Sequence, residues 1–263
     1  MEENKIETGV QSIDRAFQIL EVLAEHPQGL SIAELVDIVR SNKSTIHRIL
    51  QTLVKWGYTS KNEKTKAYRL GMKVVALSSH YLNGVELRTE ALQFMELLQQ
   101  RTGLFVHLGL LDGKDVVYLE KIGPYAHLRM YSQIGKRATL YSTSLGKAMF
   151  AGLDEARRES LLKQLTFEPV TERTVKDKES FLKEIERTKK RGFALDDEEN
   201  ELGMRCAASP IFDYTGRVIA AISVSGYTYS FTTEKIPEYG AYTIEYAACI
   251  SERMGYRPAD QKA

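Results

Sequence analysis

Cysteine is scarce in this sequence, and long apolar runs are absent. The two cysteines, Cys206 and Cys249, lie 43 positions apart, which argues against a disulfide framework and against a Cys-x-x-Cys zinc site. No run of about 18 uninterrupted apolar residues occurs, and the N-terminal MEENKIETG is polar and acidic, so neither a membrane span nor a secretory signal is expected. These absences predict a cytoplasmic protein with reduced thiols, no membrane partner, no metal site and no cofactor.

The chain as a whole lacks an excess of positive or negative charge, but one part of it is strongly positive. The 36 Lys and Arg residues nearly balance the 35 Asp and Glu residues, which gives a net charge of +1. Between Arg40 and Lys73, however, nine basic residues accompany a single acidic one, Glu63, so this window carries +8 and the rest of the chain −7. Such a patch is typical of a surface that binds a polyanion, although an ordinary solvated surface has similar weight on charge alone.

The first forty residues contain the pattern of two short helices. Apolar residues recur at helical spacing over 12–25, and the breakers in 26–29 then end the helix. Ser31-Ile32-Ala33-Glu34 has the form of a capping box, in which the serine oxygen accepts a backbone N–H and the glutamate accepts the N–H of the serine. A second helix therefore follows Ser31 and should end near Arg40.

The third predicted helix has two different faces. Asn42 or Ser41 can cap its start. Its core face contains the residues at i, i+3, i+4 and i+7, which are Ile46, Ile49, Leu50 and Leu53. The opposite face carries polar and basic side chains, namely Ser44, His47, Arg48, Gln51 and Lys55. Two short helices in close succession, the second polar on its free face, form a helix-turn-helix, whose second helix enters the major groove of DNA.

A lysine-rich hairpin after this helix predicts a winged helix-turn-helix. Residues 58–60 and 67–70 have the character of short strands, and the turn between them, 61–66, is rich in lysine. The residues expected to contact base edges or the DNA backbone are Asn42, Lys43, Ser44, Thr45, His47, Arg48, Lys61, Lys64 and Lys66. A winged helix that binds protein is the alternative, and His47 taken alone is equally an ordinary surface histidine.

The rest of the chain is large enough for a second domain. With 263 residues, 43% of them hydrophobic, the chain can form two domains. We assign the winged helix to 1–70, a linker or dimerisation helix to 71–87, and an α+β domain to 88–263, with an antiparallel sheet covered by helices on one side. Its predicted strands are 105–111, 116–122, 128–134, 193–196, 206–212 and 218–225, with hairpin turns at 112–115 and 213–216. The linker helix either pairs with its twin in a dimer or packs on its own domain.

The second domain contains two features that suit a small ligand. A helix starting near Ser144 would offer the free backbone N–H groups of Leu145 and Gly146 to a carboxylate. Ser223 and Ser225 alternate with apolar residues, so their hydroxyls share one face of a strand; hydrogen bonds to neighbouring backbone explain these serines nearly as well. The acidic run 196–199 is expected to be a solvated loop rather than a metal site, because consecutive side chains point in different directions.

An enzyme is the rival class of function. Cys206 with His107 or His127, or Ser144 with Lys147, would supply a nucleophile and a base. No local motif such as Gly-x-Ser-x-Gly supports either pair, and scattered histidines are weak evidence. The sequence therefore favours a protein that is not an enzyme.

From about Ile13 to Gly255, nearly the whole chain, the sequence resembles the IclR family of bacterial transcriptional regulators. The resemblance rests on SIAEL followed by NKSTIHRILQTL, on YRLG, on LYSTSLGKA, and on DDEENELGMRCAASPIFDYTGRVIAAISVSG. It implies a winged helix-turn-helix, a linker helix used in dimerisation, and a GAF-like effector domain that also mediates tetramer formation. It also implies an effector pocket formed by Ser144, Leu145, Asp196, Cys206, Ser223 and Ser225.

Within the family, LRMYSQIGKRATLYST and ERMGY are most similar to the repressors that respond to 2-keto-3-deoxygluconate, and less similar to the glyoxylate-responsive founder. Leu145 is larger than the corresponding residue of the founder, so a pocket of different volume is expected. The resemblance implies a repressor of a catabolic operon that binds double-stranded operator DNA as a homodimer or homotetramer. Its effector would be a small organic acid, such as a keto or sugar acid.

Overall fold

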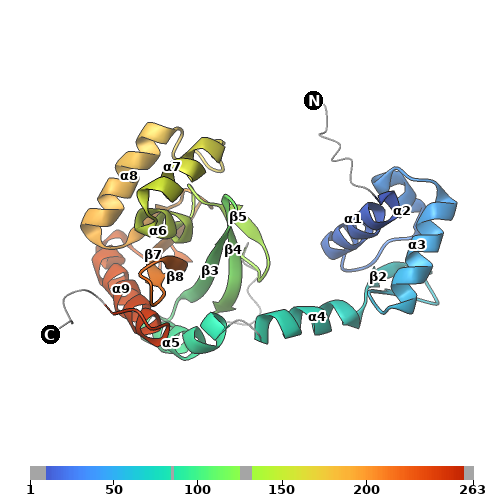
Figure 1. Ribbon diagram of the computed structural model, residues 1–263, viewed down its shortest axis with the longest axis horizontal. Coiled ribbons are helices and arrows are strands. Elements are labelled where there is room, and N and C mark those ends of the chain that lie inside the picture. Colours follow the sequence, from blue (N-terminus) through green and yellow to red (C-terminus); the bar gives the residue numbers. More distant parts are fainter. Residues whose placement is uncertain (1–9, 84–85, 125–131, 258–263) are drawn as a thin grey trace. The chain divides into compact units, whose positions relative to one another are not determined.

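The computed structural model describes residues 10–83, 86–124 and 132–257, which form two compact units (Figure 1). The first unit ends at residue 84 and the second begins at residue 85. This division falls within the predicted linker, 71–87, and the helix that follows the wing therefore belongs to the first unit.

In the described part of the first unit there are four helices and a small hairpin, and the first three helices with the hairpin confirm the predicted winged helix-turn-helix. Its elements are α1 (Gln11–Glu25), α2 (Ile32–Val39), α3 (Lys43–Lys55), β1 (Thr59–Lys61), β2 (Tyr68–Leu70) and α4 (Met72–Asn83). β1 pairs antiparallel with β2, and a bridge joins Leu30 to Tyr68. The core of the unit draws buried side chains from α1, α2, α3 and the wing: Ile19, Leu23, Leu30, Leu35, Ile46, Ile49, Leu50 and Tyr68.

Side-chain caps determine where α2 and α3 begin. Ser31 N–H donates to Glu34 Oε2 at 2.7 Å, and Glu34 N–H donates to Ser31 Oγ at 3.3 Å, which confirms the capping box. Asn42 Oδ1 accepts the N–H of Thr45 at 2.9 Å, so Asn42 caps α3. Arg40 lies between the helices in the left-handed region, with φ 51°, and reverses the chain there.

The second unit is an α+β domain built on one six-stranded antiparallel sheet, which confirms the predicted fold class. The strands are β3 (Phe105–Asp112), β4 (Asp115–Ile122), β5 (Arg137–Thr139), β6 (Ala194–Asp197), β7 (Met204–Phe212) and β8 (Val218–Tyr227). Their order across the sheet is β5-β4-β3-β8-β7-β6. The helices are α5 (Glu86–Thr102), α6 (Ser144–Gly152), α7 (Glu155–Gln164), α8 (Lys178–Arg191) and α9 (Ile236–Arg253). Among all the residues described, no helix combines the length and apolar character needed to cross a bilayer.

Helices cover both faces of this sheet, which corrects the expectation of one covered face. α6 packs in the same core as Ala208 and Ala221, whereas α9 meets the opposite face, where Ser209 Oγ lies 2.9 Å from Thr243 Oγ1 (Figure 1). Consecutive residues of β8 are buried, and because alternate side chains point to opposite faces, such burial requires cover on both sides. The near-continuous apolar run at 218–224 was the sequence signal for this arrangement.

One strand differs from the expectation. The predicted strand 128–134 falls mostly outside the described residues, and its described end, 132–134, is not a strand. β5 takes the edge of the sheet instead and pairs with β4. Arg137 of β5 forms ion pairs with Asp112 and Asp115, which hold this short strand against the β3–β4 hairpin.

Candidate nucleic-acid interface and ligand cavity

The free face of α3 carries cationic and polar side chains. Ile46 and Leu50 are buried in the core, which turns Lys43, His47 and Arg48 outward, and all three are exposed. Within the described residues, no hydrogen bond or ion pair occupies these three side chains. They can therefore donate hydrogen bonds to phosphates or to base edges.

The residues at the start of α3 are partly engaged in its cap. Asn42 Oδ1 accepts the backbone N–H of Thr45 at 2.9 Å and the hydroxyl of Ser44 at 3.0 Å. The side-chain amide of Asn42 keeps its two donors, and the oxygen of Ser44 keeps its capacity to accept. Hydrogen bonds to base edges are therefore easier for His47 and Arg48 than for Ser44 or Thr45.

The wing presents its lysines beside the start of α3. Lys61, Lys64 and Lys66 are all exposed. Lys61 and Lys66 line a depression of about 390 Å³ together with Lys43, so three of the predicted phosphate-binding residues meet on one concave surface. Lys66 Nζ also lies 3.0 Å from Glu63 Oε2, an exposed pair that adds little to stability.

A small cavity of about 30 Å³ lies beside the sheet of the second unit. Its lining residues are His107, Tyr118, Ser132, Asp196, Asn200, Glu201, Met204, Cys206 and Ser225. Strand pairing brings three of the predicted effector residues together here. Asp196 of β6 is the register partner of Cys206 of β7, and Cys206 is in turn the partner of Ser225 of β8.

The other predicted effector residues, Ser144, Leu145 and Ser223, are buried but do not line this cavity. Leu145 packs against Gly109 of β3, in the core between α6 and the sheet. The segment that opens α6 nevertheless reaches the cavity wall, because the hydroxyl of Ser142 donates to Asn200 Oδ1 at 3.1 Å.

His107 lines the cavity, whereas the sequence suggested it only as a possible base for Cys206 in an enzyme. Its Nε2 lies 2.8 Å from Ser132 Oγ, and its Nδ1 lies 3.3 Å from Ser225 Oγ. Six of the lining residues were not predicted from the sequence as pocket residues: His107, Tyr118, Ser132, Asn200, Glu201 and Met204. The register of β3 against β8 and the path of the loops bring these residues together, and neither can be read from one sequence.

The acidic run 196–199 is not the solvated loop that we expected. Its side chains do point in different directions, but Asp196 is only 3% exposed. The other three carboxylates form ion pairs with cations from other elements: Asp197 with Arg205 at 2.7 Å, Glu198 with Arg173 at 2.6 Å, and Glu199 with Lys147 at 2.5 Å. Lys147 and Arg173 lie far from the run in the sequence, whereas Arg205 follows it closely, and the acidic run alone did not indicate any of the three pairs.

Burial controls the charges around the cavity. It raises the pKa of Asp196 to about 7, although the ammonium of Lys147 opposes this rise. It also raises the pKa of the Cys206 thiol well above its usual value, and the charge of Asp196 adds to the effect. Burial lowers the pKa of His107 to about 3, and Lys121 contributes. At neutral pH the thiol and the imidazole are therefore uncharged, and the cavity offers hydroxyl, amide and carboxyl groups to a small polar ligand.

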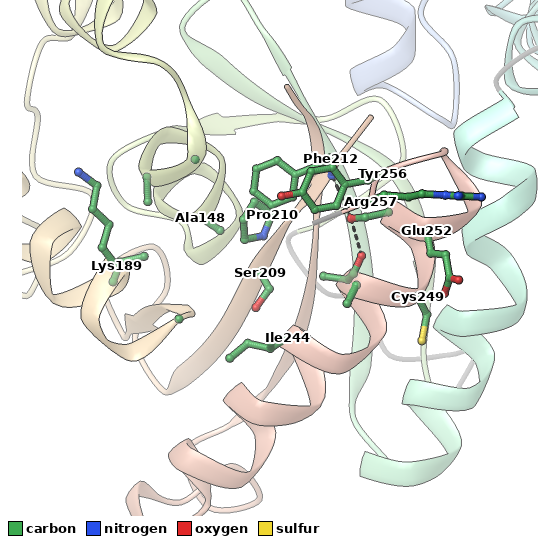
Figure 2. Close-up of a pocket in the computed structure, with 17 residues that line it drawn as sticks. Ala148, Lys189, Ser209, Pro210, Phe212, Ile244, Cys249, Glu252, Tyr256 and Arg257 are labelled. Carbon is green, nitrogen blue, oxygen red and sulfur yellow. Dashed lines mark hydrogen bonds between the residues drawn. The ribbon is translucent and has the colours of Figure 1, made fainter. Parts of the chain in front are cut away.

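A larger groove of about 660 Å³ lies elsewhere in the second unit (Figure 2). α6, α8 and α9 contribute its walls, and Ser209, Pro210 and Phe212 of β7 line it. β6 pairs with β7 only as far as Ala208, so this part of β7 is a sheet edge. Pro210 has no N–H, and Phe212 N–H donates to Ser251 Oγ at 3.0 Å, which disfavours the addition of another strand. None of the predicted site residues lines this groove.

Comparisons with known proteins match both units. The family model "IclR helix-turn-helix domain" matches residues 12–63, and "Bacterial transcriptional regulator IclR C-terminal" matches residues 79–252. The chain is similar to the Escherichia coli HTH-type transcriptional regulator KdgR, with 38% identity and 94% of each chain covered. It is also similar to the Escherichia coli regulator XynR, with 35% identity over 94% of this chain and 98% of XynR. The crystal structure of Thermotoga maritima IclR matches with a TM-score of 0.81 and 33% identity, covering 93% of this chain and 99% of that one.

Proposed function

The chain belongs to the IclR family of bacterial transcriptional regulators, and from this premise we propose that it is a cytoplasmic repressor whose affinity for operator DNA is changed by a small organic acid. The main support for DNA binding is the free face of α3, where Lys43, His47 and Arg48 are exposed beside the lysines of the wing. α3 would lie in the major groove, and the wing would contact the backbone.

The decisive test is binding to DNA. Fluorescence anisotropy compares the purified protein on promoter fragments from its own locus and on random duplex of equal length, at the same salt concentration. We expect the operator to bind at least about a thousandfold more tightly than random duplex. Failure to bind any duplex, even at low salt, would contradict this function and favour a winged helix that binds protein.

We assign the organic acid to the cavity beside Asp196, Cys206 and Ser225. Its volume of about 30 Å³ is far below the roughly 300–1,000 Å³ of typical small-molecule pockets, so the cavity must widen to admit an acid. A ligand that needs the wider cavity favours one conformation of the domain over another, as a switch requires.

A thermal-shift screen of keto and sugar acids tests this effector class. The likeness to KdgR supports the inclusion of 2-keto-3-deoxygluconate among them. A ligand present at 100 times its dissociation constant stabilises the folded state by about 2.7 kcal/mol, which raises the melting temperature measurably. The effector class is wrong if no acid in the screen raises it.

We also propose that the protein acts as a homodimer or homotetramer. Exposed apolar side chains on two helices support this: Ile13 and Phe17 of α1 are 51% and 61% exposed, and Met72 and Val75 of α4 are 77% and 55% exposed. The members of each pair are three or four positions apart and share a helix face. Contiguous exposed apolar surface marks an interaction site, and a second copy of this chain would bring a second winged helix to a two-fold operator.

The rival function, an enzyme that uses Cys206, receives no support from the cavity. A nucleophilic cysteine reacts as the thiolate, whereas burial raises the pKa of this thiol. His107 Nδ1 lies beside Ser225 Oγ, and its pKa is lowered by burial, so the imidazole is poorly placed to deprotonate Cys206.

A further inference from the structure

The cavity that we assign to an organic acid is lined by two acidic residues. Asp196 and Glu201 both line it, and Glu199 lies close enough to donate its backbone N–H to Asp196. A carboxylate brought to this site meets like charge in a buried environment, where repulsion is much stronger than in water. A cation or a proton that neutralises one of these charges would therefore favour the binding of such a ligand.

Among the described residues, the cations packed around the cavity are already engaged. Lys147 of α6 is fully buried, and its Nζ lies 2.5 Å from Glu199 Oε1. Lys121 of β4 is not part of the lining, and its Nζ donates to the backbone oxygen of Ser132 at 3.2 Å. His107 of β3 lines the cavity, but its pKa of about 3 keeps it neutral.

The remaining titratable groups of the lining cannot supply a positive charge. These are the thiol of Cys206 on β7 and the phenol of Tyr118 on β4, which are neutral or negative in every protonation state. Neutralisation by a proton is therefore the route that the described residues leave for a bound carboxylate.

We propose that a carboxylate effector enters this cavity together with one proton, which Asp196 holds, so that Asp196 binds the effector as a neutral acid and donates a hydrogen bond to its carboxylate. The inference rests on the proposed effector class. The proton comes from solvent, and no covalent bond of the effector changes.

The surroundings of Asp196 suit a carboxyl group that carries a proton. Its Oδ1 accepts the backbone N–H groups of Glu199 at 2.8 Å and Asn200 at 3.3 Å, so Oδ2 is the oxygen that would hold the proton. These two bonds and the ammonium of Lys147 lower the pKa of Asp196, but burial has the larger effect and raises it. Burial raises the pKa of Asp196 to about 7, so protonation near neutral pH requires little free energy. A second carboxylate in contact raises that pKa further, which makes the bound state take up a proton.

The pH dependence has a defined sign. Below the pKa of Asp196, about 7, this carboxyl is already protonated, and effector affinity does not change with pH. Above this pKa, the affinity for the effector decreases with pH, and the decrease approaches tenfold for each pH unit. The reason is that binding takes up one proton, and the proton concentration falls tenfold for each pH unit. Effector sensing therefore weakens in alkaline conditions.

Calorimetry of the full-length protein with 2-keto-3-deoxygluconate tests the proposal. Titrations at pH 8 in two buffers of different ionisation enthalpy count the protons taken up, and a pKa of about 7 predicts close to one proton for each ligand. Affinity should fall roughly eightfold between pH 7.5 and pH 8.5. Asp196→Asn, a neutral isostere, should bind with no proton uptake and equal affinity at the two pH values.

Glu201→Gln is the matched control, because it removes another carboxylate from the same lining. It should keep the proton uptake of the wild type. Uptake that persists in Asp196→Asn and disappears in His107→Gln would assign the proton to the imidazole and overturn the proposal. Binding by the wild-type protein without any proton uptake would overturn it as well.

A titration of the ligand-free protein separates this inference from the effector class. The carboxyl ¹³C resonances of labelled aspartate are followed as a function of pH, and the resonance of Asp196 is the one that is missing from Asp196→Asn. This resonance should titrate with a midpoint near 7. A midpoint near the ordinary value of about 3.9 refutes the proposal whether or not the keto acid binds. Absence of heat with 2-keto-3-deoxygluconate would contradict the choice of effector, and the titration would still decide the state of Asp196.

Discussion

Arg48 and Lys64 are both exposed cations of the first unit, but they should act differently on DNA. An arginine on the recognition helix can form two hydrogen bonds with one guanine, whereas a wing lysine contacts phosphate. We expect Arg48→Ala to lose about 1–3 kcal/mol of preference for operator over random duplex. Lys64→Ala should weaken both complexes alike and lower the slope of log K against log salt by about one. Equal losses on both duplexes for Arg48→Ala, measured by anisotropy, would remove it from base recognition.

Ser223 and Ser225 share a strand face, yet only Ser225 lines the cavity. Ser225→Ala should weaken effector binding about twofold to twelvefold, because one hydrogen bond contributes ~0.5–1.5 kcal/mol. Ser223→Ala should change it less than about twofold, and neither variant should alter ligand-free affinity for DNA. Calorimetry with the acid found in the screen measures both. A larger effect for Ser223→Ala would show that the acid extends beyond the described cavity.

At the scale of elements, helix starts were the most predictable features. The capping box at Ser31 and the Asn42 cap have both bonding partners within three residues, so the pattern contains the whole interaction. β5 was missed, because it has three residues and its position follows from pairing with β4. Local signals specify where a helix begins, whereas a short edge strand is specified by its neighbour.

The exposed apolar pair on α4 gives a prediction about assembly. Val75 and Leu77 are both 55% exposed, but two positions along a helix place them on nearly opposite faces. Val75→Glu should weaken dimerisation at least tenfold, about 1.4 kcal/mol, because it puts a charge on the face that Val75 shares with Met72. Leu77→Glu, the matched control, should leave the dimer intact. Light scattering over a concentration series measures both, and the reverse ranking would place the interface on the other face.

For the whole molecule, the effector and the operator must influence each other equally. We expect a saturating acid to change operator affinity about 5- to 150-fold, which corresponds to ~1–3 kcal/mol of coupling. Operator DNA must then change the affinity for the acid by the same factor and in the same direction. Anisotropy with and without acid and calorimetry with and without operator measure the two factors. An acid that binds but leaves operator affinity unchanged would show that the cavity does not control DNA binding.

The sequence by itself determined the winged helix, its caps, the basic free face of α3 and the hairpin turns of the second unit. Each of these depends on residues a few positions apart, whose periodicity and turn chemistry are visible along the chain. The family resemblance also pointed to Asp196, Cys206 and Ser225, and comparison with known regulators confirmed the family.

Only the tertiary structure decided how the second unit is layered and how its cavity is charged. The register of β6, β7 and β8 joins Asp196 to Cys206 and Ser225. Cations outside β6 form ion pairs with the three carboxylates that follow Asp196. The protonation of Asp196 depends on burial, which is a property of the packed domain and not of neighbours in the chain. Strand pairing between distant residues and the burial of a side chain leave no local pattern in the sequence. Both are therefore determined only when the domain folds.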